Sequence, residues 1–181
     1  MSALAGRHVV LGVSGGIACY KACIIARRLT EDGALVDVVM TASATEFIRP
    51  LTFEALTARP VVTSLWQPGR ALDHIRLGRA PELIIVAPAT AQLLARAALG
   101  MADDFLTAMI LARKAPLLLC PAMNDRMYAH AETQRNLARL RRRGERGDSP
   151  PLHILGPATG PLAHGEGEGP GRMVEPEEVL A

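Results

Sequence analysis

The chain has 181 residues, of which 49% are hydrophobic and 21% are charged. This length suits one domain, and this composition can bury an apolar core, so a disordered chain is excluded. There are 20 basic and 18 acidic residues, and only 3% of the residues are aromatic. A nucleic-acid-binding surface needs more positive charge and more rings. We therefore expect one globular domain over residues 1–181 and no nucleic-acid partner.

The chain has three cysteines, Cys19, Cys23 and Cys120, which are too few for a disulfide scaffold. Cys19 and Cys23 lie four residues apart, but no third ligand accompanies them, so we predict no metal site. No apolar run reaches the roughly 20 residues that cross a bilayer, and the first residues do not have the pattern of a signal peptide. These features predict a cytoplasmic protein that does not enter a membrane.

Short apolar strands alternate with helical stretches along the chain. The first strand, at 8–13, ends in a glycine-rich turn, and apolar residues then recur at helical spacing as far as Gly33. Further strands are expected at 36–40, 83–86, 117–120 and 153–155, and helices at 44–58 (interrupted by Pro50), 90–99, 104–113 and 133–144. Continuous apolar strands separated by helices predict an α/β fold with three layers, in which a Rossmann-like or flavodoxin-like parallel sheet has helices on both faces.

Residues 156–172 differ from the rest of the chain because glycine and proline dominate them. Such a composition does not favour any regular element. We expect a mobile flap at about 156–172.

Ligands of open parallel sheets bind beyond the carboxyl ends of the strands. The first such segment here, Ser14-Gly15-Gly16-Ile17, does not match G-x-G-x-x-G, but its backbone N–H groups suit a phosphate. A purely structural glycine-rich connection is the alternative. A dinucleotide site would place an acidic residue after the second strand, where this chain has Thr41 and Ser43. The pattern therefore favours a mononucleotide such as FMN over NAD.

Two polar residues stand out near the other strands. His74 precedes the third strand, and Asp73 would fix its tautomer only if the two side chains faced each other. A surface or structural histidine is the alternative. Asn124 follows the fourth strand, where its amide can donate a hydrogen bond to a carboxylate. The alternative for Asn124 is the N-cap of a helix that begins near Asp125.

Several short motifs occur together in a fixed order over nearly the full length. They are SGGIACYK at 14–21, DHI at 73–75, APATA at 87–91, GMADDFLT at 100–107, PAMN at 121–124 with Met127, and GRM at 171–173 with Glu175-Pro176. In this order and spacing the chain resembles the homo-oligomeric, flavin-containing cysteine decarboxylases.

The resemblance implies a site and a chemistry. His74 would be the catalytic histidine, and Asn124, with Met127, would bind the cysteinyl substrate. FMN would accept a hydride equivalent from the substrate, and the resulting thioaldehyde would lose CO₂ to leave an enethiolate. The active site of the family lies between protomers, so a homotrimer, or a dodecamer built from trimers, is expected. The residues implied to bind FMN are Gly15, Gly16, Ile17, Ser43, Thr45, Thr90, Ala91 and Ala122, with Ser14 in the same first turn.

One motif departs from the family. The branch that acts on phosphopantothenoylcysteine in coenzyme A biosynthesis resembles this chain in pattern, but it carries Leu-Ala-Cys-Gly where this chain has Leu162-Ala163-His164-Gly165. His164 would then be the proton donor of the flap. The branch that decarboxylates the C-terminal cysteine of a ribosomal peptide stops at the enethiol, needs no such cysteine and has short chains.

We therefore expect oxidative decarboxylation of a peptidyl cysteine. Phosphopantothenoylcysteine decarboxylase is the alternative. A non-catalytic FMN-binding regulatory protein is the alternative from another class.

Overall fold

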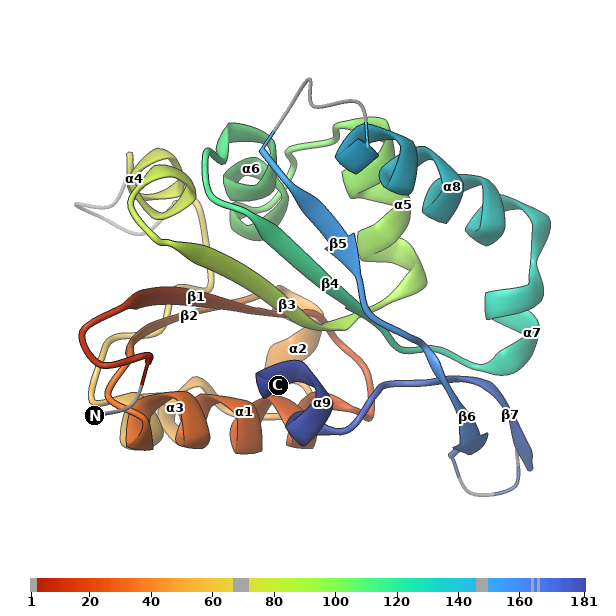
Figure 1. The fold of residues 1–181 in the computed structure, drawn as a ribbon, viewed down its shortest axis with the longest axis horizontal. Coiled ribbons are helices and arrows are strands. Elements are labelled where there is room, and N and C mark those ends of the chain that lie inside the picture. The colour runs from red at the N-terminus through yellow and green to blue at the C-terminus, as the bar shows by residue number, and fades with distance from the viewer. Residues whose placement is uncertain (1–2, 67–71, 146–149, 164, 166) are drawn as a thin grey trace.

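The structure is a computed structural model that describes residues 3–66, 72–145, 150–163, 165 and 167–181. Five strands form a parallel sheet in the order β2-β1-β3-β4-β5 (Figure 1). This is the strand order of flavodoxin-like folds, so the predicted parallel sheet is confirmed. The strands are β1 (His8–Val13), β2 (Leu35–Met40), β3 (Leu83–Ala89), β4 (Leu117–Pro121) and β5 (Leu152–Ile154).

Helices cover both faces of this sheet, as predicted (Figure 1). One face packs against α1 (Cys19–Glu31), α3 (Pro50–Thr57) and α9 (Pro176–Leu180). The other packs against α4 (Asp73–Arg79), α5 (Ala91–Leu99), α6 (Phe105–Ala112) and α8 (Ala131–Glu145). Two short helices, α2 (Ala42–Thr45) and α7 (Asp125–Ala129), follow β2 and β4. Within the described residues no helix is long and apolar enough to span a bilayer.

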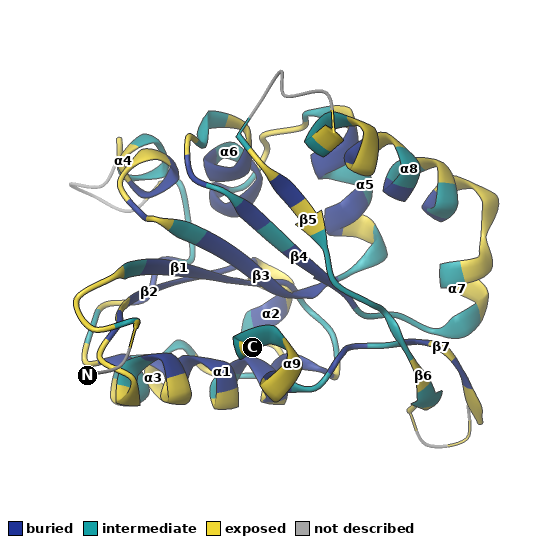
Figure 2. Ribbon diagram, in the orientation of Figure 1, coloured by how far each residue is buried: buried dark blue, intermediate teal, exposed yellow. Residues whose placement is uncertain are grey.

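The core consists of two apolar clusters, one on each side of the sheet. Successive residues of β1 alternate between them: Val9 and Leu11 belong to the cluster beneath α1, and Val10 belongs to the cluster beneath α5 and α6. Figure 2 shows the resulting band of buried residues along the strands. Because both faces are covered, nearly every strand position is apolar, and this is why the strands could be recognised as continuous apolar runs.

The helix predicted at 44–58 is wrong in its extent. The structure has two helices in this region, α2 and α3, and Pro50 is the first residue of α3 rather than an interruption within a helix. Proline is well tolerated at the first helical position, because the N–H that it lacks would have no partner inside the helix.

The prediction that residues 156–172 hold no regular element is also wrong for the described residues. β6 (Ala158–Pro161) and β7 (Glu168–Arg172) form an antiparallel pair that extends beyond the main sheet (Figure 1). Glycine serves close packing here. Gly171 has a φ of 145°, and a Cβ built on it would lie 2.3 Å from the Met123 carbonyl oxygen. The composition therefore reflects the approach of β7 to the segment after β4.

Candidate functional site

Ser14 joins the turns that follow β1 and β3. Its side chain is buried, and its Oγ donates a hydrogen bond to the Pro88 carbonyl at 2.7 Å and accepts one from the Thr90 N–H at 3.0 Å. The hydroxyl is therefore occupied within the protein. This geometry gives Ser14 a structural role at the site, in holding two neighbouring turns in a fixed relation.

Gly15 and Gly16 lie between the turns after β2 and β3. A Cβ on Gly15 would lie 2.5 Å from Ser43 Cβ and 2.6 Å from the Ser43 carbonyl carbon and oxygen. A Cβ on Gly16 would lie 3.5 Å from Thr90 Cγ2, which is ordinary van der Waals contact. Only Gly15 is therefore required by packing. Packing within the chain leaves room for a Cβ at Gly16.

A cavity of about 310 Å³ lies where these turns meet. Four hydroxyl-bearing residues line it, namely Ser14, Thr41, Ser43 and Thr90. Thr41 Oγ1 and Ser43 Oγ are 3.0 Å apart, and Thr90 is the N-cap of α5. Hydroxyl groups beside the positive end of a helix suit a phosphate group.

Arg96, Asp103 and Asp104 also line this cavity. Arg96 contacts Asp104 at 2.9 Å and Asp103 at 3.3 Å. Asp104 is also the N-cap of α6, where it forms a capping box with Thr107. The charge of Arg96 is thus balanced by protein carboxylates, and these three residues hold the start of α6 beside the cavity.

His74 lies in the first turn of α4 and packs edge-on against Phe105, with ring centroids 6.3 Å apart. Its Nδ1 is buried and has no hydrogen-bond partner among the described residues. Asp73 does not fill this role, since its Oδ1 accepts a hydrogen bond from Arg76 Nε at 3.1 Å. A buried polar atom without a hydrogen-bond partner costs about 1–3 kcal/mol in stability, and such atoms are often found at functional sites.

Asn124 is the N-cap of α7, and its Oδ1 accepts a hydrogen bond from the Arg126 N–H at 2.9 Å. The N-cap interpretation is therefore correct, but it uses only the oxygen of the amide. The Nδ2 group makes no hydrogen bond within the described residues and keeps its donors available. The cap fixes the orientation of the whole amide. The N-cap role of Oδ1 is therefore compatible with a binding role of Nδ2.

The remaining predicted residues lie at or near the same edge of the sheet. Ile17 is 68% exposed and Met127, on α7, is 51% exposed. The hydroxyl of Thr45 donates to the Ala42 carbonyl at 2.7 Å, Ala91 begins α5, and the N–H of Ala122 donates to the Ala89 carbonyl at 3.1 Å. His164 lies outside the described residues.

His74 and Asn124 are not brought together within one chain. Figure 1 places α4 and α7 at opposite ends of the molecule in this view. The residues at the carboxyl ends of β1, β2 and β3 surround one cavity, whereas Asn124 follows β4 and contacts the hairpin. One chain therefore holds parts of a site rather than a closed active site.

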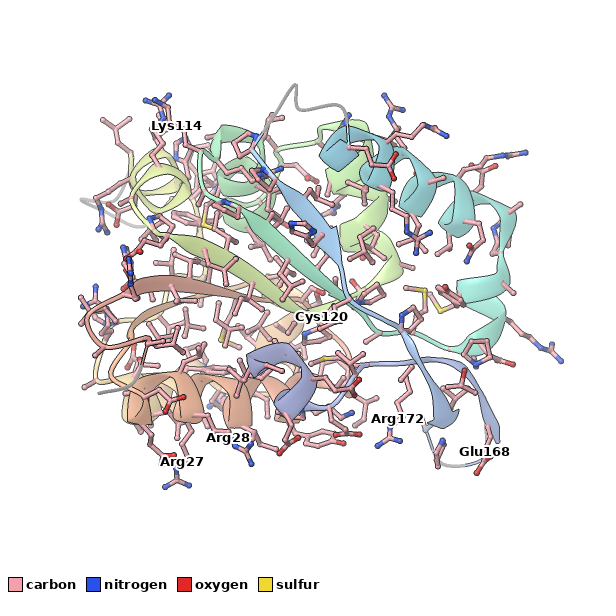
Figure 3. The ribbon with its side chains drawn as sticks, viewed as in Figure 1. Arg27, Arg28, Lys114, Cys120, Glu168 and Arg172 are labelled. Carbon is pink, nitrogen blue, oxygen red and sulfur yellow. The ribbon has the colours of Figure 1, made fainter. Side chains whose placement is uncertain are left out.

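The three cysteines do not supply a reactive thiol. Cys120 lies near the carboxyl end of β4 (Figure 3), and burial raises its pKa to about 12. Burial also raises the pKa of Cys19 and Cys23. Cys19 and Cys120 are buried, and thiols with a raised pKa carry little thiolate at neutral pH, so they are poor nucleophiles.

Sequence reasoning missed Arg96 with its two carboxylates and the buried side chain of Lys21. Asp104 could have been found, because an aspartate followed three residues later by threonine, just before an apolar run, is typical of a helix N-terminus. Lys21 gave no such signal, because its partners, Met173 and Glu175, lie more than 150 residues away in the chain.

The strand order and the position of the cavity identify the class of protein. This is a doubly wound α/β protein with a cavity at the carboxyl edge of a flavodoxin-like sheet. The model of the family described as Flavoprotein matches residues 2–181. The chain belongs to the Flavoprotein family.

Named relatives agree with this assignment. The coenzyme A biosynthesis bifunctional protein CoaBC of Vibrio vulnificus is 49% identical over 183 residues, which cover 100% of this chain and 44% of that protein. The chain thus spans less than half the length of this relative. Two solved structures are also similar. A mutant of PPC decarboxylase complexed with pantothenoylaminoethenethiol has a TM-score of 0.80 at 29% identity, covering 96% of this chain and 94% of that one. The FMN-dependent cysteine decarboxylase SpaF has a TM-score of 0.75 at 31% identity, covering 93% and 91%.

Proposed function

We propose that this chain binds FMN at the carboxyl edge of β1, β2 and β3 and is an FMN-dependent decarboxylase of a cysteinyl carboxylate. The cavity supports the cofactor: the hydroxyl groups of Thr41, Ser43 and Thr90 and the N-terminus of α5 suit a phosphate. Thr41 follows β2 where a dinucleotide site would have an acidic residue. Sheets with this strand order bind FMN between β1 and β3.

The size of the cavity supports a shared site. Its volume of about 310 Å³ is at the lower end of the roughly 300–1,000 Å³ of ligand pockets. We therefore propose that one chain holds the phosphate end of FMN and that a second copy completes the wall. The homotrimer, or the dodecamer built from trimers, that the resemblance implies would supply such a copy and stays a prediction.

FMN, when bound, supplies a hydride acceptor for the carbon that bears the substrate thiol. Asn124 would donate from Nδ2 to the substrate carboxylate while its Oδ1 remains in the helix cap. A neutral donor orients the carboxylate without adding a positive charge that would stabilise it strongly before CO₂ leaves. His74, held by Phe105, would move the thiol proton, an effect worth about 10²–10⁴ in rate.

Phosphopantothenoylcysteine is the favoured substrate. The observation that carries this choice is the 49% identity, over the whole chain, to a coenzyme A biosynthesis protein, against 31% to SpaF. The peptide substrate expected from the sequence is thus less well supported than its alternative. On this proposal residues 1–181 form one decarboxylase domain, and His164 protonates the enethiolate in place of cysteine, with the hydride returned by the reduced cofactor. The cytoplasmic location stays a prediction.

The mass of the product tests the proposal. Protein loaded with FMN is incubated separately with phosphopantothenoylcysteine and with a peptide that ends in cysteine. Loss of CO₂ alone from the first substrate is the expected result. Loss of CO₂ plus two hydrogens from the peptide, with no turnover of the first substrate, would favour the peptide branch. Bound FMN without turnover of either would favour the regulatory alternative, and a colourless protein that cannot be reconstituted would refute FMN binding.

Complementation tests the shared site. We expect His74→Asn and Asn124→Asp to be inactive alone and, when refolded together in equal amounts, to regain about a quarter of the sites, since each site then needs one particular copy on each side. Without any recovery, His74 and Asn124 would have to act from the same chain.

A further inference from the structure

Lys21 is a buried lysine on α1 whose amine is held by the segment after β7. The residue is 3% exposed, and its Nζ donates to the Met173 carbonyl at 2.8 Å and lies 3.1 Å from Glu175 Oε1. Lysine is rarely buried to this extent without a partner, because burial of its charge costs free energy. The position is therefore maintained by these two contacts.

The same two contacts anchor the base of the hairpin. Met173 directly follows the last residue of β7, and Glu175 also pairs with Arg172, which ends β7 and lies between α9 and the hairpin (Figure 3). The side chains of Met173 and Val174 are buried in the same cluster as α1. Lys21 thus connects the carboxyl end of β7 to α1, which packs one face against the core.

β7 in turn holds the segment that carries Asn124. The Met123 N–H donates to the Gly171 carbonyl at 2.9 Å. Side chains larger than hydrogen would not fit between these segments, since a Cβ on Gly169 would lie 2.9 Å from Asp125 Cβ, and one on Gly171 would lie 2.3 Å from the Met123 carbonyl oxygen. A shift of β7 would therefore move the residues on both sides of Asn124.

We propose that Lys21 is a positioning residue for Asn124, acting through Met173, β7 and Met123. The role of Asn124 rests on the proposed function, but the structural connection does not. When Lys21 holds the end of β7, the Asn124 amide stays oriented for the substrate carboxylate. When that contact is lost, β7 and the Met123–Asn124 segment gain freedom together.

The test variant is Lys21→Met, which keeps an unbranched apolar stem and removes the amine. The matched control is Arg28→Gln on the same helix, because Arg28 forms an ion pair with Glu177 of α9 at 2.8 Å but contacts neither Met173 nor Glu175 in the structure. Both variants break one link between α1 and the C-terminal segment. Only Lys21→Met breaks the link to β7.

Two readouts separate positioning from general destabilisation. The first is amide hydrogen exchange of Met123 in the FMN-loaded protein without substrate, which we expect to become about tenfold faster or more in Lys21→Met. The second is steady-state kinetics with phosphopantothenoylcysteine. We expect KM to rise and kcat/KM to fall by up to about a hundredfold. General destabilisation would lower the amount of active enzyme, and so the apparent kcat, without raising KM.

The outcomes are distinct from those that test the proposed function. If the wild-type protein decarboxylates nothing, the function fails, while the exchange of Met123 still decides whether Lys21 controls this segment. Wild-type exchange and wild-type KM in Lys21→Met would overturn the inference, as would equal changes in Arg28→Gln. Should Lys21→Met not fold, Lys21→Gln serves instead, because it removes the ammonium group and shortens the side chain that reaches Met173. We expect it to give smaller changes in the same direction, and no change would overturn the inference.

Discussion

Replacement of Gly15 by alanine should destabilise the protein, whereas the same change at Gly16 should not. The Cβ of Gly15→Ala would lie 2.5–2.6 Å from three atoms of Ser43, two of them backbone. Backbone cannot rotate away as the end of a side chain can, so the turn after β1 or the turn after β2 must shift. Overpacking of this kind costs about 1–3 kcal/mol. In a chain of this length that cost lowers Tm by roughly 2–12 °C.

The neighbouring glycine is the matched control. At Gly16 the added Cβ would meet Thr90 Cγ2 at 3.5 Å, and the loss of backbone freedom in the unfolded chain offsets any small clash. We expect the unfolding free energy of Gly16→Ala to stay within about 1 kcal/mol of wild type.

Denaturant unfolding of the FMN-free proteins, at one fixed protein concentration, measures this packing effect without the cofactor. FMN titration of the same proteins measures the site. We expect Gly15→Ala to weaken FMN binding in proportion to its shift of the turn, and Gly16→Ala to weaken it with little change in stability. If Gly15→Ala unfolds at the same denaturant concentration as wild type, the turn after β1 is not confined by Ser43, and the argument from close packing is refuted.

Three further predictions concern single residues. Asn124→Asp keeps an equally good N-cap but replaces a hydrogen-bond donor with a negative charge. We expect kcat/KM for decarboxylation to fall at least about a hundredfold, while denaturant unfolding stays close to wild type. Unchanged kinetics would show that Asn124 does not bind the substrate carboxylate. His164→Ala should shift the product, read by mass, from loss of CO₂ to loss of CO₂ plus two hydrogens, and an unchanged product would exclude His164 as the donor. Burial raises the pKa of Asp37, but hydrogen bonds from Arg59 and His8 outweigh it and lower that pKa below its usual value. Asp37→Asn should therefore cost about 1.5–3 kcal/mol at pH 7, measured by unfolding. This difference should begin to shrink as the pH falls below about 4, where the unfolded chain takes up the proton, and should be lost only below the lowered pKa of folded Asp37. A difference that does not depend on pH would contradict the ion pairs.

The parallel sheet could be predicted because its signal is local. A strand that is covered on both faces must be apolar at nearly every position, as in β1 and β3. The polar residues at the strand ends could be found for a related reason, since the carboxyl edge of a parallel sheet is where ligands bind. Thr41, Ser43 and Thr90 indeed surround one cavity.

The hairpin and the role of Ser14 could not be predicted because they depend on contacts between distant segments. The glycine content of 156–172 suggested irregular chain, but Gly171 is needed where β7 approaches Met123. The contact of Ser14 with the cofactor stays a prediction, but the sequence did not show that its hydroxyl bonds to Pro88 and Thr90, about 75 residues away in the chain. Composition records neither partner.

The two parts of the candidate site are held in different ways, and this difference has a consequence for specificity. The cofactor edge consists of turns that bond directly to one another, as Ser14 does to Thr90. The substrate edge depends on a longer series of contacts, from Lys21 through Met173 and β7 to Met123. Substitutions in β7 and its base can therefore move Asn124 without disturbing the turns that surround the cavity. On the proposed function, the turns that hold the cofactor therefore stay unchanged when substitutions in β7 alter the substrate that Asn124 accepts.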